Sequence, residues 1–420
     1  MKKKIILQIK KKKPNKKFLF LIGGFIFGII ITVAYFQLPE LISNRYTFLE
    51  TTDNNQLVVV LAEEEKIEPE QLVVSHIKTP LEVKAIYMSS WVAGTQSIRN
   101  KILKDIEGTN INAIVIDIKD YTGRISFNVS DPYLQEIKSA ENRIPNIKEF
   151  IESLHQKNIY VIGRISSFQD SYLIKKRPDL GVKKESNKSV LWKDKKGVGW
   201  LDAGSEEVWK YLMAIGEEAY QVGFDELNFD YIRFPSDGNM SDIYYPFSEG
   251  KVKADVIRNF SSFLYENFKD SEVVLSADVF GMTTINTDDL NIGQILEYMV
   301  PYFDFVSPMV YPSHYPKNWN GIQYPAQNPY QVVKYSLDKA VERMKIINQN
   351  PNKIRPWLQD FNLGATYTPQ MVNTQIQAVF DSGLSSWMLW DAGNTYTIES
   401  LSFIPITEKT EAIPEIEQID

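Results

Sequence analysis

Eight short apolar runs recur between residues 84 and 391, and this repetition constrains the fold more than any other feature of the chain. The runs are rich in Val, Ile and Phe and mostly lack strict alternation, as expected of parallel strands covered on both faces. Amphipathic helical stretches follow them. The runs are Lys84–Ser90, Asn112–Ile118, Ile159–Ile165, Phe224–Asp230, Val273–Val279, Phe303–Tyr311, Ile354–Asp360 and Ser386–Asp391. Eight β/α repeats predict an α/β fold, a (β/α)8 TIM barrel over residues 81–403.

A doubly wound open sheet is the alternative fold, but no glycine-rich phosphate loop follows any of the runs. The longest interruption is residues 167–204, between the third and fourth runs. Within it, Lys193–Gly197 is flanked by two apolar stretches and is expected to form a hairpin. We expect Pro145 to open the helix that runs through His155, and Ser205 to cap the helix that begins at Glu206.

An uncharged run of 21 residues, Phe18–Leu38, is long enough to cross ~30 Å of hydrocarbon as a helix. Residues 1–17 carry nine lysines and no acid, so they should stay in the cytoplasm and leave residues 39–420 outside. A cleaved signal peptide is the rival interpretation, but the run is long and lacks a clear cleavage site. The sequence therefore predicts a single-pass signal-anchor in the cell membrane.

Two further segments lack the regular pattern of apolar residues that a folded domain needs. Residues 39–80 contain an acidic patch and several prolines, and we expect an extracytoplasmic spacer with one short strand at Leu57–Leu61. Residues 404–420 alternate Pro, Glu, Thr and Ile, which predicts a flexible tail.

Charge and residue types narrow the classes of function. The net charge of −7 becomes −16 once residues 1–17 are set aside, which argues against a nucleic acid partner. The absence of cysteine excludes thiolate nucleophiles and Cys-ligated zinc. The three histidines, His76, His155 and His314, have no metal-ligand spacing, so we expect neither a metal nor a cofactor. Carboxylates and aromatic side chains remain, and these are what glycoside hydrolysis uses.

Strand alternation places the carboxylates. In the fourth run, Asn228 and Asp230 share one face, and in the fifth run Ser276 and Asp278 do; both faces oppose apolar ones. The apolar faces must pack on helices, so the polar faces point into the barrel. Active sites of such barrels lie at the C-terminal ends of the strands.

The sequence therefore predicts a site built from several strand ends. Asp230 and Asp278 are the expected catalytic pair. The expected substrate-binding residues are Asp117, Lys119, Asp120, Arg164, Asn228, Arg233, Tyr311, Gln359, Asp360, Trp390 and Asp391. Candidate aromatic platforms for sugar rings are Trp192, Trp200, Tyr311 and Trp390.

The stretch from Gly223 to Gly238, GFDELNFDYIRFPSDG, resembles the bacterial family of glycosyl hydrolase domains of unknown function within the TIM-barrel glycosidase superfamily. Matching stretches are VIDIKDYTGR at 115–124, SADVFG at 276–281, SPMVYPSHY at 307–315, IRPWLQDF at 354–361, and 386–391 with Asn394. The likeness covers about residues 83–400. It implies the barrel fold and a carbohydrate-active role.

The fourth run departs from the pattern of chitinase-like barrels, which ends in a catalytic Glu. Aligning Asp225, Asn228 and Asp230 with that pattern places Ile232 where the Glu belongs. Asp230 instead matches the fourth-strand nucleophile of amylase-like barrels, where the acid is usually a fifth-strand Glu and this chain has Asp278.

The hypothesis is a membrane-anchored glycoside hydrolase that acts on an envelope or extracellular polysaccharide by a retaining mechanism. Neighbouring strands lie ~4.8 Å apart, close to the ~5–5.5 Å between the two carboxylates of a retaining enzyme. Asp230 is the expected nucleophile and Asp278 the general acid/base. The alternative is an inactive, surface-anchored barrel that binds glycans, which the missing fifth-strand Glu favours.

Overall fold

The computed structural model describes residues 48–51, 57–60 and 74–406. The chain divides between Gln71 and Leu72 into two units. In the first, β1 (Phe48–Thr51) pairs antiparallel with β2 (Leu57–Val60), a strand that the apolar run at 57–61 predicts. The anchor predicted at 18–38, the lysine-rich residues 1–17 and most of the spacer and tail lie outside the described residues.

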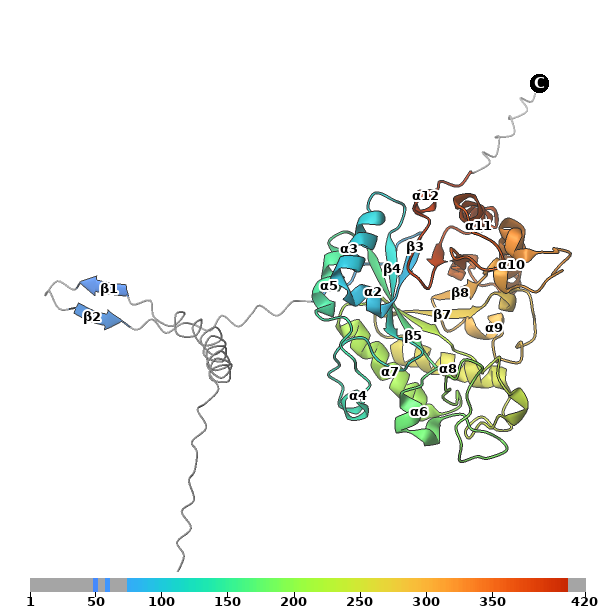
Figure 1. The fold of residues 1–420 in the computed structure, drawn as a ribbon, viewed down its shortest axis with the longest axis horizontal. Helices are drawn as coiled ribbons and strands as arrows, with labels where there is room; N and C mark the ends of the chain where they lie inside the picture. Colours follow the sequence, from blue (N-terminus) through green and yellow to red (C-terminus); the bar gives the residue numbers. More distant parts are fainter. Residues whose placement is uncertain (1–47, 52–56, 61–73, 407–420) are drawn as a thin grey trace, which may run out of the picture. The chain divides into compact units, whose positions relative to one another are not determined.

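The second unit is a closed barrel of eight parallel strands surrounded by helices (Figure 1). The strands are β3 (Lys84–Met88), β4 (Ala113–Lys119), β5 (Tyr160–Ser166), β6 (Glu226–Asp230), β7 (Val274–Phe280), β8 (Phe305–Met309), β9 (Trp357–Gln359) and β10 (Trp387–Trp390). Each lies within one of the eight apolar runs or extends one residue past its C-terminal end, and β10 pairs with β3 to close the ring. The barrel expected from the sequence is confirmed.

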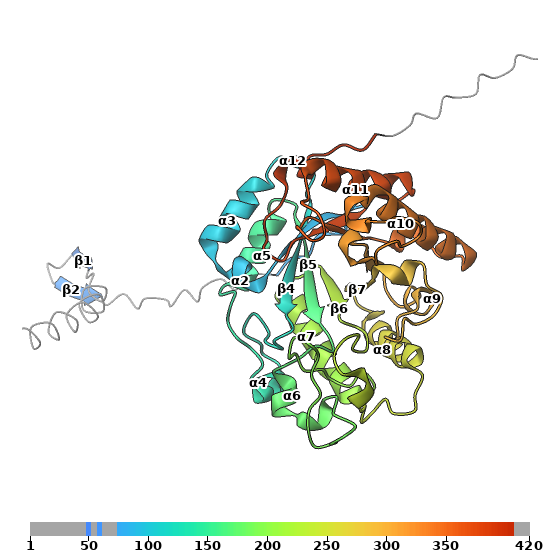
Figure 2. The same ribbon diagram turned by 45° about the vertical axis from the view of Figure 1, so that its right-hand side comes forward.

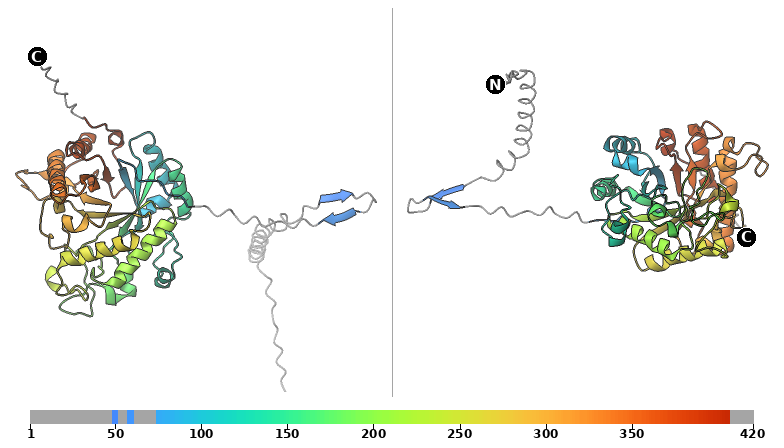
Figure 3. Two further views of the ribbon diagram at one scale, coloured as in Figure 1. Left: turned by 180° about the vertical axis from the view of Figure 1, so that it is seen from behind. Right: turned by 60° about the horizontal axis from the view of Figure 1, so that its bottom comes forward.

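Helices of different lengths connect the strands. They are α2 (Ser90–Gly94), α3 (Gln96–Asp105), α4 (Pro132–Ile137), α5 (Ile147–His155), α6 (Leu173–Lys176), α7 (Glu206–Gln221), α8 (Lys253–Phe268), α9 (Leu296–Met299), α10 (Pro329–Ile346), α11 (Pro369–Asp381) and α12 (Ile398–Leu401). Short 3-10 helices lie at Pro178–Leu180, Met240–Asp242, Gly281–Thr284, Pro312–His314, Pro325–Gln327 and Pro351–Lys353. The long helices pack side by side around the strands, as α10 and α11 do in Figure 2 and as the two views of Figure 3 show from other sides.

Local signals set several helix ends. The Ser205 side chain accepts a hydrogen bond from the Val208 N–H, and Glu206 and Glu207 occupy the first turn of α7. The helix expected from Pro145 begins two residues later, at Ile147, after Asn146 in a left-handed conformation. Between β7 and β8 the expected amphipathic helix is reduced to α9, because that connection is dominated by turns.

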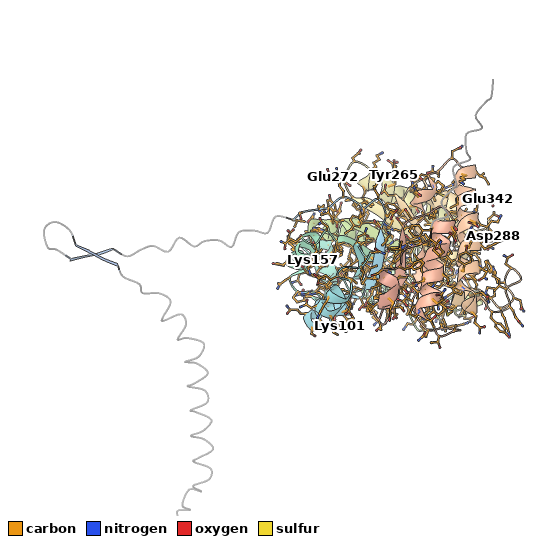
Figure 4. The ribbon with its side chains drawn as sticks, turned by 90° about the horizontal axis from the view of Figure 1, so that it is seen from above. Lys101, Lys157, Tyr265, Glu272, Asp288 and Glu342 are labelled. Carbon is orange, nitrogen blue, oxygen red and sulfur yellow. The ribbon has the colours of Figure 1, made fainter. Side chains whose placement is uncertain are left out.

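Two apolar cores follow from the alternation of the strands. Leu227, Phe229 and Leu275 pack against the helices in the larger core, as the sequence predicts. Tyr87, Val115 and Ile162 belong to a second cluster, inside the barrel. The outer surfaces of the helices and of the loops between them are exposed and carry charged and polar side chains. Figure 4 labels six that lie at the periphery of the molecule: Lys101, Lys157, Tyr265, Glu272, Asp288 and Glu342.

A buried ion pair occupies the barrel interior near the N-terminal ends of the strands. Arg355 donates hydrogen bonds to both carboxylate oxygens of Glu226, and both side chains are fully buried. Glu226 also accepts hydrogen bonds from Ser276 Oγ at 2.5 Å and Tyr160 Oη at 3.2 Å. Every oxygen of this buried carboxylate is therefore satisfied.

The chain enters the barrel at the N-terminal ends of the strands. The Ile77 N–H donates to Asp225 Oδ1 at 2.9 Å, and Asp225 directly precedes β6. His155 Nε2 lies 2.9 Å from Asp225 Oδ2, and the His76 ring stacks on Tyr220 at 4.0 Å. Burial would raise the pKa of Asp225, but the hydrogen bonds from His155, His76 and the backbone outweigh it and hold that pKa below its usual value.

No helix in the part of the chain that the structure describes is long and apolar enough to span a bilayer.

Candidate active site

A cavity of about 710 Å³ opens at the C-terminal ends of the barrel strands. It brings together seven of the residues that the sequence singled out, from β5, β6, β7, β10 and the loops that follow the strands. These are Arg164, Asp230, Arg233, Asp278, Tyr311, Trp390 and Asp391. The cavity has the position and size expected of a substrate site in this fold.

Asp230 ends β6 and is 5% exposed. Arg164 on β5 donates to its Oδ2 from Nε at 3.0 Å and from Nη2 at 2.5 Å. The N–H of Tyr231 donates to its Oδ1 at 2.5 Å. Tyr231 has φ +53, a left-handed conformation that costs a non-glycine residue free energy. This strained turn directs a backbone N–H at the carboxylate.

Asp278 lies on the neighbouring strand, β7, and is 1% exposed. Its Oδ1 accepts two hydrogen bonds, from Asn228 Nδ2 at 2.9 Å and from Trp357 Nε1 at 2.8 Å. Burial and then the charge of Asp230 raise the pKa of Asp278 to about 8. Because two donors occupy Oδ1, Oδ2 is the oxygen that can hold the proton.

The two carboxylates lie close together beside one arginine. Arg164 Nε is 3.0 Å from Asp230 Oδ2 and 4.0 Å from Asp278 Oδ2. Because the two distances add to about 7 Å, the two carboxylate oxygens can be no further apart than that. The ~5–5.5 Å between the carboxylates of retaining glycosidases falls below this limit, whereas most of the ~6.5–9.5 Å range of inverting glycosidases exceeds it.

A second carboxylate holds Arg164 in place. Arg164 Nη1 donates to Asp117 Oδ1 at 2.6 Å, and Tyr87 Oη donates to Asp117 Oδ2 at 2.6 Å. Burial alone would lower the pKa of Arg164, but the charges of Asp230 and Asp117 raise it well above its usual value. Arg164 is therefore a fixed cation, and Asp117 orients it without lining the cavity.

Aromatic rings form one side of the cavity. Trp390 stacks on Tyr87 with the ring centroids 4.1 Å apart and meets Trp357 edge-on at 5.5 Å. Tyr311 meets Phe361 edge-on at 5.5 Å. Trp390, Trp357, Tyr311 and Phe361 all line the cavity. Such rings present apolar faces to the C–H faces of sugars, while the carboxylates supply the polar contacts.

Besides Asp117, five predicted substrate contacts do not line the cavity. Lys119 is fully buried, 3.0 Å from Asp170, because a register shift between Asp117 and Lys119 breaks the alternation that would have placed them on one face. Asp120 pairs with Arg143 at 2.6 Å. Asn228 points inward one layer deeper and contacts Asp278.

The other two are Gln359 and Asp360. Gln359 accepts from the Ser313 N–H and donates to the Phe361 carbonyl, so it holds two loops together. Asp360 accepts from Thr397, and burial raises its pKa to about 6. It has the opposite parity to Gln359 and points out of the barrel.

The platforms expected in residues 167–204 are also buried. Trp192 donates from Nε1 to the Asn239 carbonyl, and Trp200 donates to Asp194. Both are buried where the insertion packs against the segment that follows β6, and neither lines the cavity. A tight antiparallel turn around Lys193 and Gly199 confirms the hairpin expected there.

Several lining residues escaped the sequence interpretation. Trp357 shares the inward parity of strand residues that were recognised, so alternation could have identified it. Phe361 and Lys196 lie in loops, where no period marks them. His314 bonds to Ser313 Oγ, as a loop histidine would, and also lines the cavity. Among the described residues, no group of three His, Cys, Asp or Glu side chains is arranged to hold a metal ion.

A family model described as "Putative glycosyl hydrolase domain" matches residues 85–396. No curated protein sequence shows a significant match to the chain. Among solved structures, a hypothetical protein from Ruminiclostridium thermocellum ATCC 27405 is 35% identical over 46% of this chain and 97% of that one, with a TM-score of 0.42.

Two further solved structures share the fold. The PgaB (BpsB) glycoside hydrolase domain from Bordetella bronchiseptica is 13% identical over 75% of this chain and 95% of its own, with a TM-score of 0.54. Alpha-L-fucosidase isoenzyme 2 from Paenibacillus thiaminolyticus is 12% identical over 77% of this chain and 49% of its own, with a TM-score of 0.51. At such identities the likeness concerns the barrel alone.

Proposed function

We infer the reaction of this chain from its family: it belongs to the family described as "Putative glycosyl hydrolase domain" and is a glycoside hydrolase by that membership. We propose that it cleaves an envelope or extracellular polysaccharide with retention of anomeric configuration. Asp230 is the nucleophile and Asp278 the general acid/base. The observation that carries this proposal is the pair of inward carboxylates in one cavity, at most about 7 Å apart, in unequal environments.

The unequal environments suit two different roles. Arg164 faces Asp230 with two N–H groups, and these charge-assisted hydrogen bonds fix the position of the carboxylate that would act as nucleophile. Asp278, with its pKa raised to about 8, holds its proton at neutral pH, as a general acid must.

The reaction then has two steps. Asp278 Oδ2 donates its proton to the glycosidic oxygen, and that bond breaks as an Asp230 oxygen bonds to the anomeric carbon. The leaving sugar departs with a hydroxyl group. In the second step the Asp278 carboxylate takes a proton from water, whose oxygen attacks the anomeric carbon and displaces Asp230. Both residues return to their starting states.

The proposal extends to cellular placement. The run Phe18–Leu38 with the lysines before it supports an uncleaved anchor with the barrel outside the cytoplasm. An enzyme in that position meets envelope and extracellular glycans.

The test uses the purified full-length chain in detergent against a panel of envelope and extracellular polysaccharides. Proton NMR of the first product should show the anomeric configuration of the cleaved bond. Asp230→Asn should lower kcat by about 10³-fold or more while glycan binding persists, because a nucleophile is lost and the shape is kept. An inverted first product would remove the retaining mechanism.

A glycan-binding barrel without activity is the second candidate, favoured by the aspartate where related barrels carry a glutamate. In that case Asp230→Ala would leave affinity nearly unchanged, and no member of the panel would be cleaved by the unmodified chain.

A further inference from the structure

The described residues include five deeply buried arginines, and four of them pair with a carboxylate. Arg143 pairs with Asp120, Arg164 with Asp230, Arg343 with Glu297 and Arg355 with Glu226. Arg233 is the exception: it is 8% exposed, and no carboxylate of the described residues lies within 4.0 Å of its guanidinium. A buried cation without a counter-ion is costly, and such groups are normally paired.

Aromatic faces and two hydrogen bonds account for only part of the Arg233 environment. Its guanidinium lies over the rings of Phe280, Trp200 and Tyr231, at 4.6, 4.9 and 5.3 Å from their centroids. Nη1 donates to the Phe234 carbonyl at 3.0 Å and to Ser236 Oγ at 3.2 Å. Such cation–π contacts hold the plane of the guanidinium without using its N–H groups.

The other side of the guanidinium is unused. Nε and Nη2 together carry three N–H groups, and none donates to a partner within the described part of the chain. Arg355 Nε also lacks a hydrogen-bond partner, but it is completely buried. Arg233 Nε and Nη2 are not completely buried, so a ligand could reach them. Because Arg233 lines the cavity, its unsealed and unused N–H groups are open to whatever occupies that space.

The surroundings do not neutralise this cation. Burial lowers the pKa of Arg233, while Tyr231, Asp230 and Asp237 act in the opposite direction from further away. Asp230 is already committed to Arg164. Arg233 follows Asp230 by three residues and lines the same cavity, so a group bound there sits beside the reacting sugar.

We propose that Arg233 forms an anion-binding subsite next to the catalytic pair, and that the substrate is an acidic glycan whose oxyanion it receives. The planar fork of Nε–H and Nη2–H matches a uronic-acid carboxylate or a sugar phosphate. This inference rests on the proposed glycosidase function and adds the chemical class of the sugar.

Paired probes test the subsite without any variant. Oligomers of galacturonate, glucuronate and mannuronate are titrated into the full-length chain by calorimetry, beside the same oligomers with their carboxylates reduced to alcohols. A hexose 6-phosphate beside the plain hexose separates phosphate from carboxylate. We expect at least one acidic probe to bind about 10- to 100-fold tighter than its neutral counterpart, the usual effect of a charged bidentate contact.

Variants then assign that preference to one side chain. Arg233→Gln should remove the difference between the affinities for the acidic and neutral members of each probe pair. Arg233→Lys, which keeps the charge without the fork, should retain part of it and serves if Arg233→Gln does not fold. Arg258→Gln on α8, a half-exposed arginine paired with Asp255 outside the cavity, should change neither.

Two results would overturn the subsite: equal binding of every acidic and neutral pair, or a preference that survives in folded Arg233→Gln. Cleavage, followed on the same probes, is a separate readout. Cleavage of neutral glycans without acid preference would refute the subsite and keep the hydrolase. Acid-selective binding without cleavage by the unmodified chain would refute the hydrolase and keep the subsite.

Discussion

At the scale of single residues, the two catalytic candidates differ in their neighbours rather than in their chemistry. Both are aspartates in the C-terminal halves of adjacent strands. Asp230 faces the cation Arg164, whereas Asp278 faces two neutral donors, Asn228 and Trp357, and the negative charge of Asp230. Environment alone therefore divides the roles of acid and nucleophile.

The first prediction concerns pH. Since Asp278 has a pKa of about 8 and must be protonated to act as an acid, kcat/KM should fall as pH rises through about 8. Asp278→Asn should lower kcat/KM by about 10²- to 10⁴-fold and abolish this alkaline limb. Initial rates between pH 5 and 10 measure both. An alkaline limb that persists in Asp278→Asn would assign the acid to another residue.

The second prediction is that Asp278 lowers stability at alkaline pH. Its folded-state pKa lies above its unfolded value, so the folded state holds a proton that the unfolded chain has lost, and stability falls as pH rises towards about 8. Asp278→Asn removes that dependence and can keep the acceptor contacts with Asn228 and Trp357. Calorimetric Tm values at pH 5 and pH 8 should show the variant gaining at least about 2 °C over the unmodified chain at the higher pH. An equal difference at both pH values would contradict this.

At the scale of elements, the sequence predicted the strands well and their C-terminal ends less well. All eight apolar runs overlap a strand, because burial on both faces of a strand gives a strong local pattern of apolar residues. Parity placed Asp230 and Asp278 correctly within β6 and β7, since each opposes an apolar face. The pattern failed at Lys119, where a register shift that depends on the neighbouring strand breaks the alternation.

Loops explain the remaining misses. Trp192 and Trp200 resemble exposed platforms in the sequence, but contacts between the insertion and the segment that follows β6 bury them. Phe361 and Lys196 reach the cavity through the path of their loops, which no local period encodes. Arg233 was recognised as a candidate, yet its lack of a partner is visible only when every neighbouring carboxylate has been placed.

The third prediction belongs to β6 and the segment before β9. Glu226→Gln should lower the free energy of unfolding by about 3–5 kcal/mol, because Arg355 would remain buried without its counter-ion. Urea denaturation at neutral pH measures it. Glu342→Gln is the matched control: Glu342 lies on the exposed side of α10, 2.7 Å from Lys339, and its loss should cost less than about 1 kcal/mol. Equal losses of unfolding free energy in the two variants would mean that the buried pair contributes no more to stability than the exposed one.

At the scale of the whole molecule, a lysine-rich start and an acidic remainder set the expected orientation. The fourth prediction is that protease added to intact cells degrades the barrel and leaves a short membrane-held stub, since residues 39–420 are expected outside. Immunoblots against the barrel and against an N-terminal tag follow the two parts. A barrel that resists protease until the cells are lysed would refute this topology.

The attachment of the chain at His76 and Ile77 has a consequence for where the enzyme works. The chain joins the barrel at the N-terminal ends of the strands, and the cavity opens at the opposite ends. With the proposed anchor at 18–38 and with β1 paired to β2, residues 39–47 and 61–73 limit how far the barrel can travel, to at most about 80 Å. An enzyme held in the proposed way would trim polymer within a shell of fixed depth and leave more distant material intact. Spacer length, rather than catalytic rate, would set the thickness of the cleared layer around the cell.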